Sequence, residues 1–104
     1  MRDFITYDVR TSLPVERIYE IVAKQLPEFA WRQGDSDAQG PYISGTDSDA
    51  VQMKLWLGED PMTISASFRA IRDLNKRQSR QIDLVDVLET VVLPGLGIVL
   101  KKNG

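Results

Sequence analysis

Residues 50–68 read AVQMKLWLGEDPMTISASF, the most regular apolar pattern in the chain. Apolar side chains occupy every second position from 51 to 57 and again from 62 to 68. Between the two runs stands the turn-forming tetrapeptide GEDP at 58–61. Strict alternation on both sides of a turn predicts an antiparallel β-hairpin with one apolar face and one mostly polar face.

One register of this hairpin separates the two faces. With residues 58–61 as the loop, the apolar face pairs Leu57 with Met62, Leu55 with Ile64, Met53 with Ala66 and Val51 with Phe68. The other face pairs Trp56 with Thr63, Lys54 with Ser65 and Gln52 with Ser67. A slip by one residue would bury Lys54 and expose the aliphatic row, so the pairing is well specified.

The length and composition indicate one globular domain. We expect it to comprise residues 1–100, followed by a frayed tail at 101–104. The chain has neither cysteine nor histidine, so it lacks disulfides, the usual neutral-pH base and the commonest metal ligand. The N-terminus carries acids rather than a signal-peptide core, and the longest apolar run, 91–100, is broken by proline and glycine. We therefore expect a cytoplasmic protein with no membrane segment.

The first part of the chain predicts a strand and a helix. Residues 3–10 alternate like a strand, and an amphipathic pattern follows from Val15 to Leu26. Pro14 fits the first helical turn, which leaves Ser12 or Leu13 as the capping position, and serine is the chemically better cap. Pro27 should end the helix.

The middle of the chain predicts two short strands around a loop. Residues 29–33 form a weak strand pattern, with Phe29, Trp31 and Gln33 on one face. Residues 34–41 have almost nothing to bury and predict a loop, after which 42–46 form a short strand.

After residue 68 the apolar period becomes helical. We favour one long helix over about 73–93, stopped by Pro94 and Gly95. A sixth strand through 79–84, followed by a shorter helix, is the alternative. Residues 96–100 fit either an edge strand or a packed tail.

The predicted order is strand, helix, four strands, helix. This order favours an α+β two-layer sandwich, with an antiparallel sheet of four to five strands and both helices on its apolar face.

Two patterns resemble a metal site or a catalytic pair, but each lacks a feature that such a site requires. Asp35, Asp37, Gln39 and Gly40 match the first half of a calcium loop, but Thr46 stands where a bidentate glutamate is needed. Calcium is therefore not expected to raise the melting temperature. The cross-strand pair Lys54–Ser65 lies on a half-exposed face, and a nucleophilic pair requires a desolvated lysine. We expect no enzyme activity, no metal and no cofactor.

Charge is unevenly distributed along a chain whose net charge is −2. Residues 35–60 contain six acids and one base, and residues 69–80 contain five bases and one acid. On a helix, Arg69, Arg72, Lys76 and Arg80 would fall along one side and could contact phosphates. This segment has no aromatic side chain for base stacking, and a solvated helix face or a patch for an acidic protein also explains it.

Trp56 is the more informative residue, because it projects from the polar face of the hairpin. Phe4 is placed to join it, beside the small hydroxyl side chains of Thr63, Ser65 and Ser67. The leading hypothesis is a non-catalytic binding module that uses this open face for a protein partner or a second copy of the chain. One alternative is a small-ligand carrier or enzyme with a cavity between sheet and C-terminal helix. Nucleic-acid binding through residues 69–80 is the other.

Overall fold

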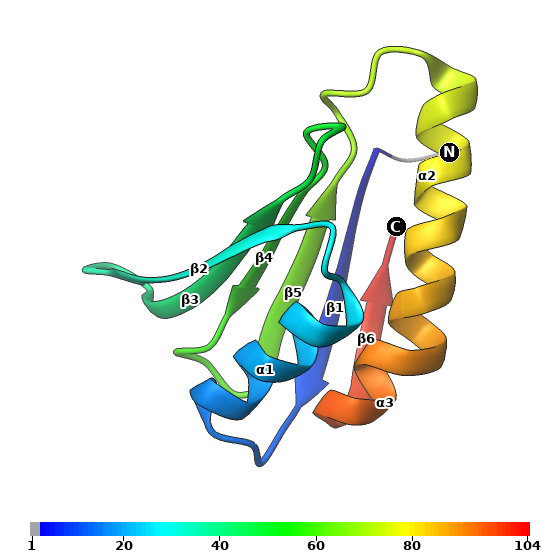
Figure 1. Cartoon of the computed structure of the whole chain (residues 1–104). Coiled ribbons are helices and arrows are strands. Elements are labelled where there is room, and N and C mark those ends of the chain that lie inside the picture. Colours follow the sequence, from blue (N-terminus) through cyan, green and yellow to red (C-terminus); the bar gives the residue numbers. More distant parts are fainter. Residues whose placement is uncertain (1–2) are drawn as a thin grey trace.

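One antiparallel sheet of six strands forms the first layer of the computed structural model, which describes residues 3–104 (Figure 1). The strand order is β2-β3-β4-β5-β1-β6. The strands are β1 Phe4–Arg10, β2 Ala30–Ser36, β3 Gly40–Thr46, β4 Gln52–Trp56, β5 Met62–Ser67 and β6 Ile98–Asn103. The predicted α+β class is confirmed, with a strand count above the predicted four to five.

Helical segments form the second layer, and they cover one face of the sheet (Figure 1). They are α1 Val15–Gln25, α2 Leu74–Val87, the π-helical turn η1 Leu88–Val92 and α3 Leu93–Leu96. The last three follow one another without a break, so residues 73–82 lead into a long helix and the alternative strand at 79–84 is not formed. No helix within residues 3–104 combines the length and the hydropathy needed to cross a membrane.

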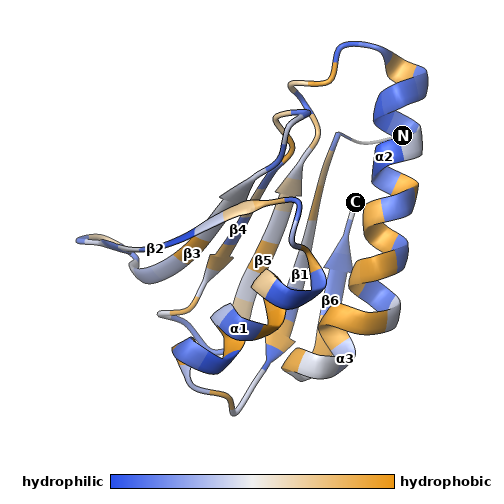
Figure 2. Ribbon diagram, viewed as in Figure 1, coloured by the Kyte–Doolittle hydropathy of each residue, from blue (hydrophilic) through white to orange (hydrophobic). Residues whose placement is uncertain are grey.

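The central hairpin has the predicted register. In β4 and β5, Leu55 faces Ile64 and Lys54 faces Ser65. Leu55 is fully buried, with none of its surface exposed. The core lies between the alternating apolar residues of the sheet and the apolar sides of α1 and the C-terminal helical segment (Figure 2).

The start of α1 differs from the prediction. Pro14 itself is the N-cap residue, and its carbonyl accepts hydrogen bonds from the N–H groups of Arg17 and Ile18, each at 3.1 Å. An N-cap residue has extended backbone angles, and its carbonyl accepts the first hydrogen bond of the helix. Pro14 has both features, although it has no side-chain oxygen to cap a backbone N–H. Ser12 is therefore not the cap. The helical bonding ends at Leu26, just before Pro27.

The expected loop at 34–41 is largely a hairpin. β2 continues to Ser36 and β3 begins at Gly40, so the connection is short. A Cβ at Gly34 would overlap the ring of Tyr42, which faces it across the strands. The polar composition of residues 34–41 gives no strand pattern, because the outer part of the hairpin has no buried apolar row. Its main packing contact is one tyrosine ring against one glycine.

Pro94 does not end the C-terminal helix, which continues to Leu96. In η1 the N–H of Leu93 bonds the carbonyl of Leu88, five residues back, and Thr90 Oγ1 donates to the Asp86 carbonyl at 2.6 Å. A proline inside an α-helix removes a hydrogen bond and crowds the preceding turn. The wider π turn is placed immediately before Pro94, and α3 begins there as a new helical turn.

Residues 96–100 lead into an edge strand. β6 pairs with β1, with a register shift between Asp8 and Val9. The strand includes Lys101, Lys102 and Asn103, so the tail that we expected to be frayed is paired as far as Asn103.

Candidate functional site

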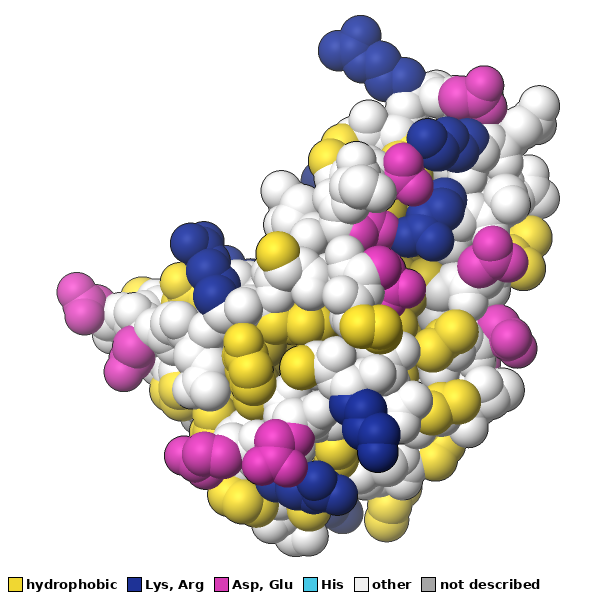
Figure 3. Space-filling model, viewed as in Figure 1, with side chains coloured by type: hydrophobic (Ala, Val, Ile, Leu, Met, Phe, Trp, Pro, Cys, Tyr) yellow, Lys and Arg dark blue, Asp and Glu magenta, His cyan; other side chains and the backbone are white. Residues whose placement is uncertain are grey.

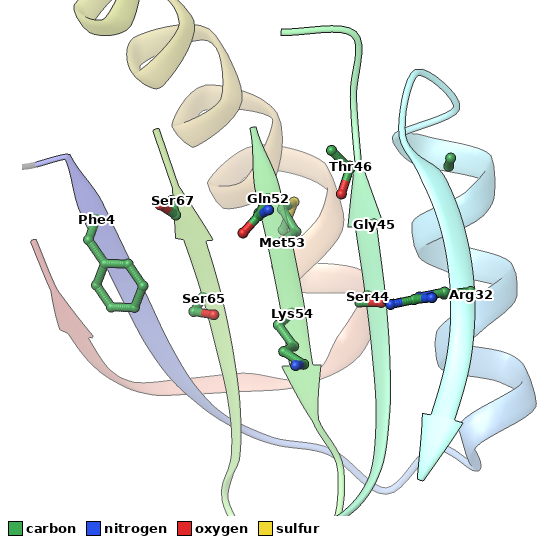
Figure 4. A pocket seen from close by; sticks show the side chains of 11 residues that line it. Phe4, Arg32, Ser44, Gly45, Thr46, Gln52, Met53, Lys54, Ser65 and Ser67 are labelled. Atoms are coloured by element: carbon green, nitrogen blue, oxygen red, sulfur yellow. Dashed lines mark hydrogen bonds between the residues drawn. The ribbon is translucent and has the colours of Figure 1, made fainter. Parts of the chain in front are cut away.

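The face of the sheet turned away from the helices, part of which Figure 4 shows from close by, carries three cross-strand rows of side chains. The first row is Gly34, Tyr42, Trp56, Thr63, Asp8 and Lys101. The second row is Arg32, Ser44, Lys54, Ser65, Thr6 and Asn103. The third row is Ala30, Thr46, Gln52, Ser67 and Phe4. We call these three rows the open face.

Two aromatic rings and one ammonium group form a cluster on the open face. The Lys54 Nζ atom lies 4.4 Å from the ring centroid of Trp56 and 4.6 Å from that of Tyr42. The two rings are 5.3 Å apart and tilted by 55°. A cation above aromatic faces is attracted by their electron density, so this contact holds the Lys54 charge in place on the sheet.

A hollow of about 300 Å³ lies over the second and third rows (Figure 4). Its lining includes four hydroxyl side chains and two cations, and no carboxylate belongs to it among the described residues. The lining residues are Phe4, Ala30, Arg32, Ser44, Gly45, Thr46, Gln52, Met53, Lys54, Ser65 and Ser67. Hydroxyl donors beside two cations make a concave surface suited to an anionic group.

The polar contacts of the open face leave much of its donor capacity unused. Arg32 Nε donates to Ser44 Oγ at 3.2 Å, which leaves the terminal nitrogens of its guanidinium group for an outside acceptor. Thr63 Oγ1 donates to Asp8 Oδ1 at 3.3 Å, in the first row and outside the hollow. The three rows together contain three cations, Arg32, Lys54 and Lys101, against this one carboxylate.

The structure brings the predicted residues Trp56, Thr63, Ser65 and Ser67 together on the open face, each half-buried. Phe4 lies on the same face in the third row, beneath the Arg69 guanidinium at 5.4 Å, so it is not in Trp56's row. The aromatic partner of Trp56 is Tyr42, which the sequence reasoning missed. Its position depends on the pairing of β3 with β4, for which the hairpin pattern gave no signal.

The basic residues of 69–80 do not form a free cationic strip. Arg69 pairs with Asp3 at 3.5 Å and Lys76 with Asp49 at 2.9 Å. Arg80 pairs with both Asp47 and Asp49. Of the four predicted residues, Arg72 is exposed and takes part in none of these pairs.

Acids and bases meet along the upper part of the molecule, where magenta and dark-blue side chains adjoin (Figure 3). The opposite charges of residues 35–60 and 69–80 are therefore partly brought together within the chain.

The acidic tip of the β2–β3 hairpin does not gather into a metal site. Within residues 3–104, no three or more carboxylates come close enough together to hold a cation.

Comparison of the chain with protein-family models, with curated proteins and with solved structures found no match, so the function has to be argued from the residues themselves.

Proposed function

We propose that this protein is a small non-catalytic binding module whose open face holds an acidic segment of a partner protein. The observation that carries the proposal is the hollow lined by Arg32, Lys54 and four hydroxyl groups, with no carboxylate in its described lining. This cationic surface belongs to a chain with 15 acids and 13 bases. Charge complementarity of this kind steers association and selects partners of opposite charge.

The two sides of the open face would contribute differently to binding. Arg32 can offer a carboxylate the forked donors of its guanidinium group, and Lys54 supplies a second charge already held by two rings. Because the ammonium position is fixed in advance, less side-chain entropy is lost on binding. Trp56 and Tyr42 add a large apolar contact at the margin of the hollow, as interface anchors do.

Small side chains in the second and third rows allow close approach of a partner backbone. The hollow is lined by short side chains, which include Ser44, Ser65 and Ser67. Their hydroxyl groups can donate to carboxylates or peptide carbonyls. We favour an acidic protein segment over a nucleic acid, because the hollow of about 300 Å³ presents only two cations in its described lining, and a long phosphate backbone would extend beyond them. A partner in the cytoplasm is consistent with the absence of cysteine.

The proposal is tested by the fluorescence of Trp56 in a Trp31→Phe background. Hexaglutamate peptide should change the emission saturably, and the affinity should fall as salt is added. The double variant Arg32→Gln/Lys54→Gln should lose at least tenfold in affinity. Arg72→Gln removes an exposed arginine outside the open face and should bind like the parent.

Three results would overturn the proposal. One is equal binding by the double variant and the parent. Another is tighter binding of oligothymidylate than of hexaglutamate, which would make nucleic acid the partner. The third is a concentration-dependent change of Trp56 emission without peptide, with dimers in sedimentation, which would make a second copy the occupant.

A further inference from the structure

A second hollow, separate from the open face, lies between α2 and the edge of the sheet at β1 and β6. It measures about 640 Å³, about twice the volume of the hollow on the open face. Its apolar surface comes from Ile5, Ile82 and Val85. Gln81, Asp86, Glu89, Thr90, Lys102 and Gly104 complete the lining. We call it the helix–edge groove. Its size and apolar walls with a few polar groups are those of small-molecule sites.

One polar group in this lining, the Gln81 side-chain oxygen, finds no partner among the described residues. Gln81 as a whole residue is 6% exposed, and its Oε1 atom accepts no hydrogen bond within residues 3–104. Leaving a buried acceptor unpaired is unfavourable, and such groups are few in folded proteins. The terminal torsion of glutamine is broad, so the amide can turn toward a donor in the groove at small cost.

At the far end of the groove, Glu89 and Lys102 already have hydrogen-bond partners. Glu89 Oε2 accepts from the Tyr7 hydroxyl at 2.8 Å and from Lys102 Nζ at 2.5 Å. Glu89 lies in η1, and π turns occur often at functional sites. A smaller hollow of about 270 Å³ lies beyond, and shares Glu89 and Lys102 as its wall.

From these observations we infer that the helix–edge groove binds a small apolar molecule that bears one hydroxyl or amine group. Its donor hydrogen would meet Gln81 Oε1, and its apolar body would lie along Ile82, Val85 and Ile5 toward Glu89. Eight residues separate Gln81 from Glu89, which is about 12 Å of helix at the usual rise. A chain of six to eight carbons fills such a length. No bond is made or broken, so the groove would carry or sense its ligand.

Two isomeric probes distinguish the contribution of the donor hydrogen to affinity from that of the apolar body. 1-Heptanol and hexyl methyl ether have the same atoms, but the alcohol alone carries a donor hydrogen. Titrations followed by ¹H–¹³C methyl spectra should show saturable shifts at Ile5, Ile82 and Val85. The alcohol should bind about three- to tenfold more tightly than the ether, the range expected for one hydrogen bond.

Three variants make the test decisive. Gln81→Leu should bring the two isomers to equal affinity. Val85→Trp should fill the groove and abolish the shifts, and Val91→Trp, on η1 but outside the groove lining, should retain them. Equal affinity of the isomers in the parent, no saturable shift from either probe, or shifts that survive in folded Val85→Trp would each overturn the inference. If Val85→Trp fails to fold, the Gln81→Leu comparison still decides.

Discussion

The Asp47 carboxylate is shared between its own turn and the Arg80 guanidinium of α2, which lies 33 residues further along the chain. Asp47 Oδ1 accepts the N–H groups of Asp49 at 2.9 Å and Val51 at 3.0 Å, and Oδ2 pairs with Arg80. The Asp47 side chain is 3% exposed. One buried acid therefore shapes the β3–β4 connection and ties it to the first half of α2.

We expect Asp47→Ala to lower the free energy of unfolding by about 1–3 kcal/mol, because it leaves buried donors without an acceptor. Urea denaturation measures the loss. Asp49→Ala is the matched control, since its side chain is 27% exposed and its partner Lys76, which is 56% exposed, can turn to water. A loss from Asp49→Ala as large as that from Asp47→Ala would contradict this assignment.

The apolar face of the central hairpin gives a second prediction. Leu55→Ala should cost about 2–5 kcal/mol, as large-to-small changes in a packed core do. Leu100→Ala, on the exposed edge strand, removes the same atoms and should cost much less. Chemical denaturation of both variants tests this difference. A Leu55→Ala loss below about 0.5 kcal/mol would mean that the two faces of the hairpin are reversed.

The contact between Glu89, Lys102 and Tyr7 predicts the pH dependence of stability. Hydrogen bonds from Lys102 and then Tyr7 lower the pKa of Glu89, while burial and then the Glu89 carboxylate raise the pKa of Tyr7. The Glu89 contribution is present above about pH 4.3, the ordinary glutamate value, and is lost as pH falls through its lowered pKa. The Tyr7 contribution is present below about pH 10 and is lost as pH rises further.

Thermal unfolding as a function of pH separates the two groups. Glu89→Gln should flatten the acid limb of the stability profile, and Tyr7→Phe should flatten the alkaline limb. Glu16→Gln, an exposed acid on α1, is the control for removing one charge. An acid limb as steep in Glu89→Gln as in the parent would show that this contact does not govern acid stability.

The sequence predicted those elements that its own local pattern specifies. In β4 and β5, a period of two and a turn cluster were enough to fix the register and to place Trp56 opposite the core. The prediction that Pro94 ends the helix was wrong, because it assumed α-helical hydrogen bonds around the proline. The π turn just before Pro94 changes that bonding, and the helix continues to Leu96.

The candidate site was predicted in part, for the same reason. The hydroxyl row of β5 follows from alternation within one strand. Arg32 and Tyr42 reach the open face through the pairing of β2 with β3 and of β3 with β4, and the intervening residues 34–41 read as a loop. The unpaired Gln81 depends on how α2 lies over the sheet edge, which no periodicity encodes.

Binding of an acidic segment at the open face can be located residue by residue in ¹H–¹⁵N spectra of the labelled protein with hexaglutamate. We predict saturable shifts that gather on β2 to β5, with the largest changes at Arg32, Lys54 and the Trp56 indole. Residues of α2 should remain unchanged. Shifts that gather on residues 69–80 instead, or an absence of saturable shifts anywhere, would show that the open face does not bind an acidic segment.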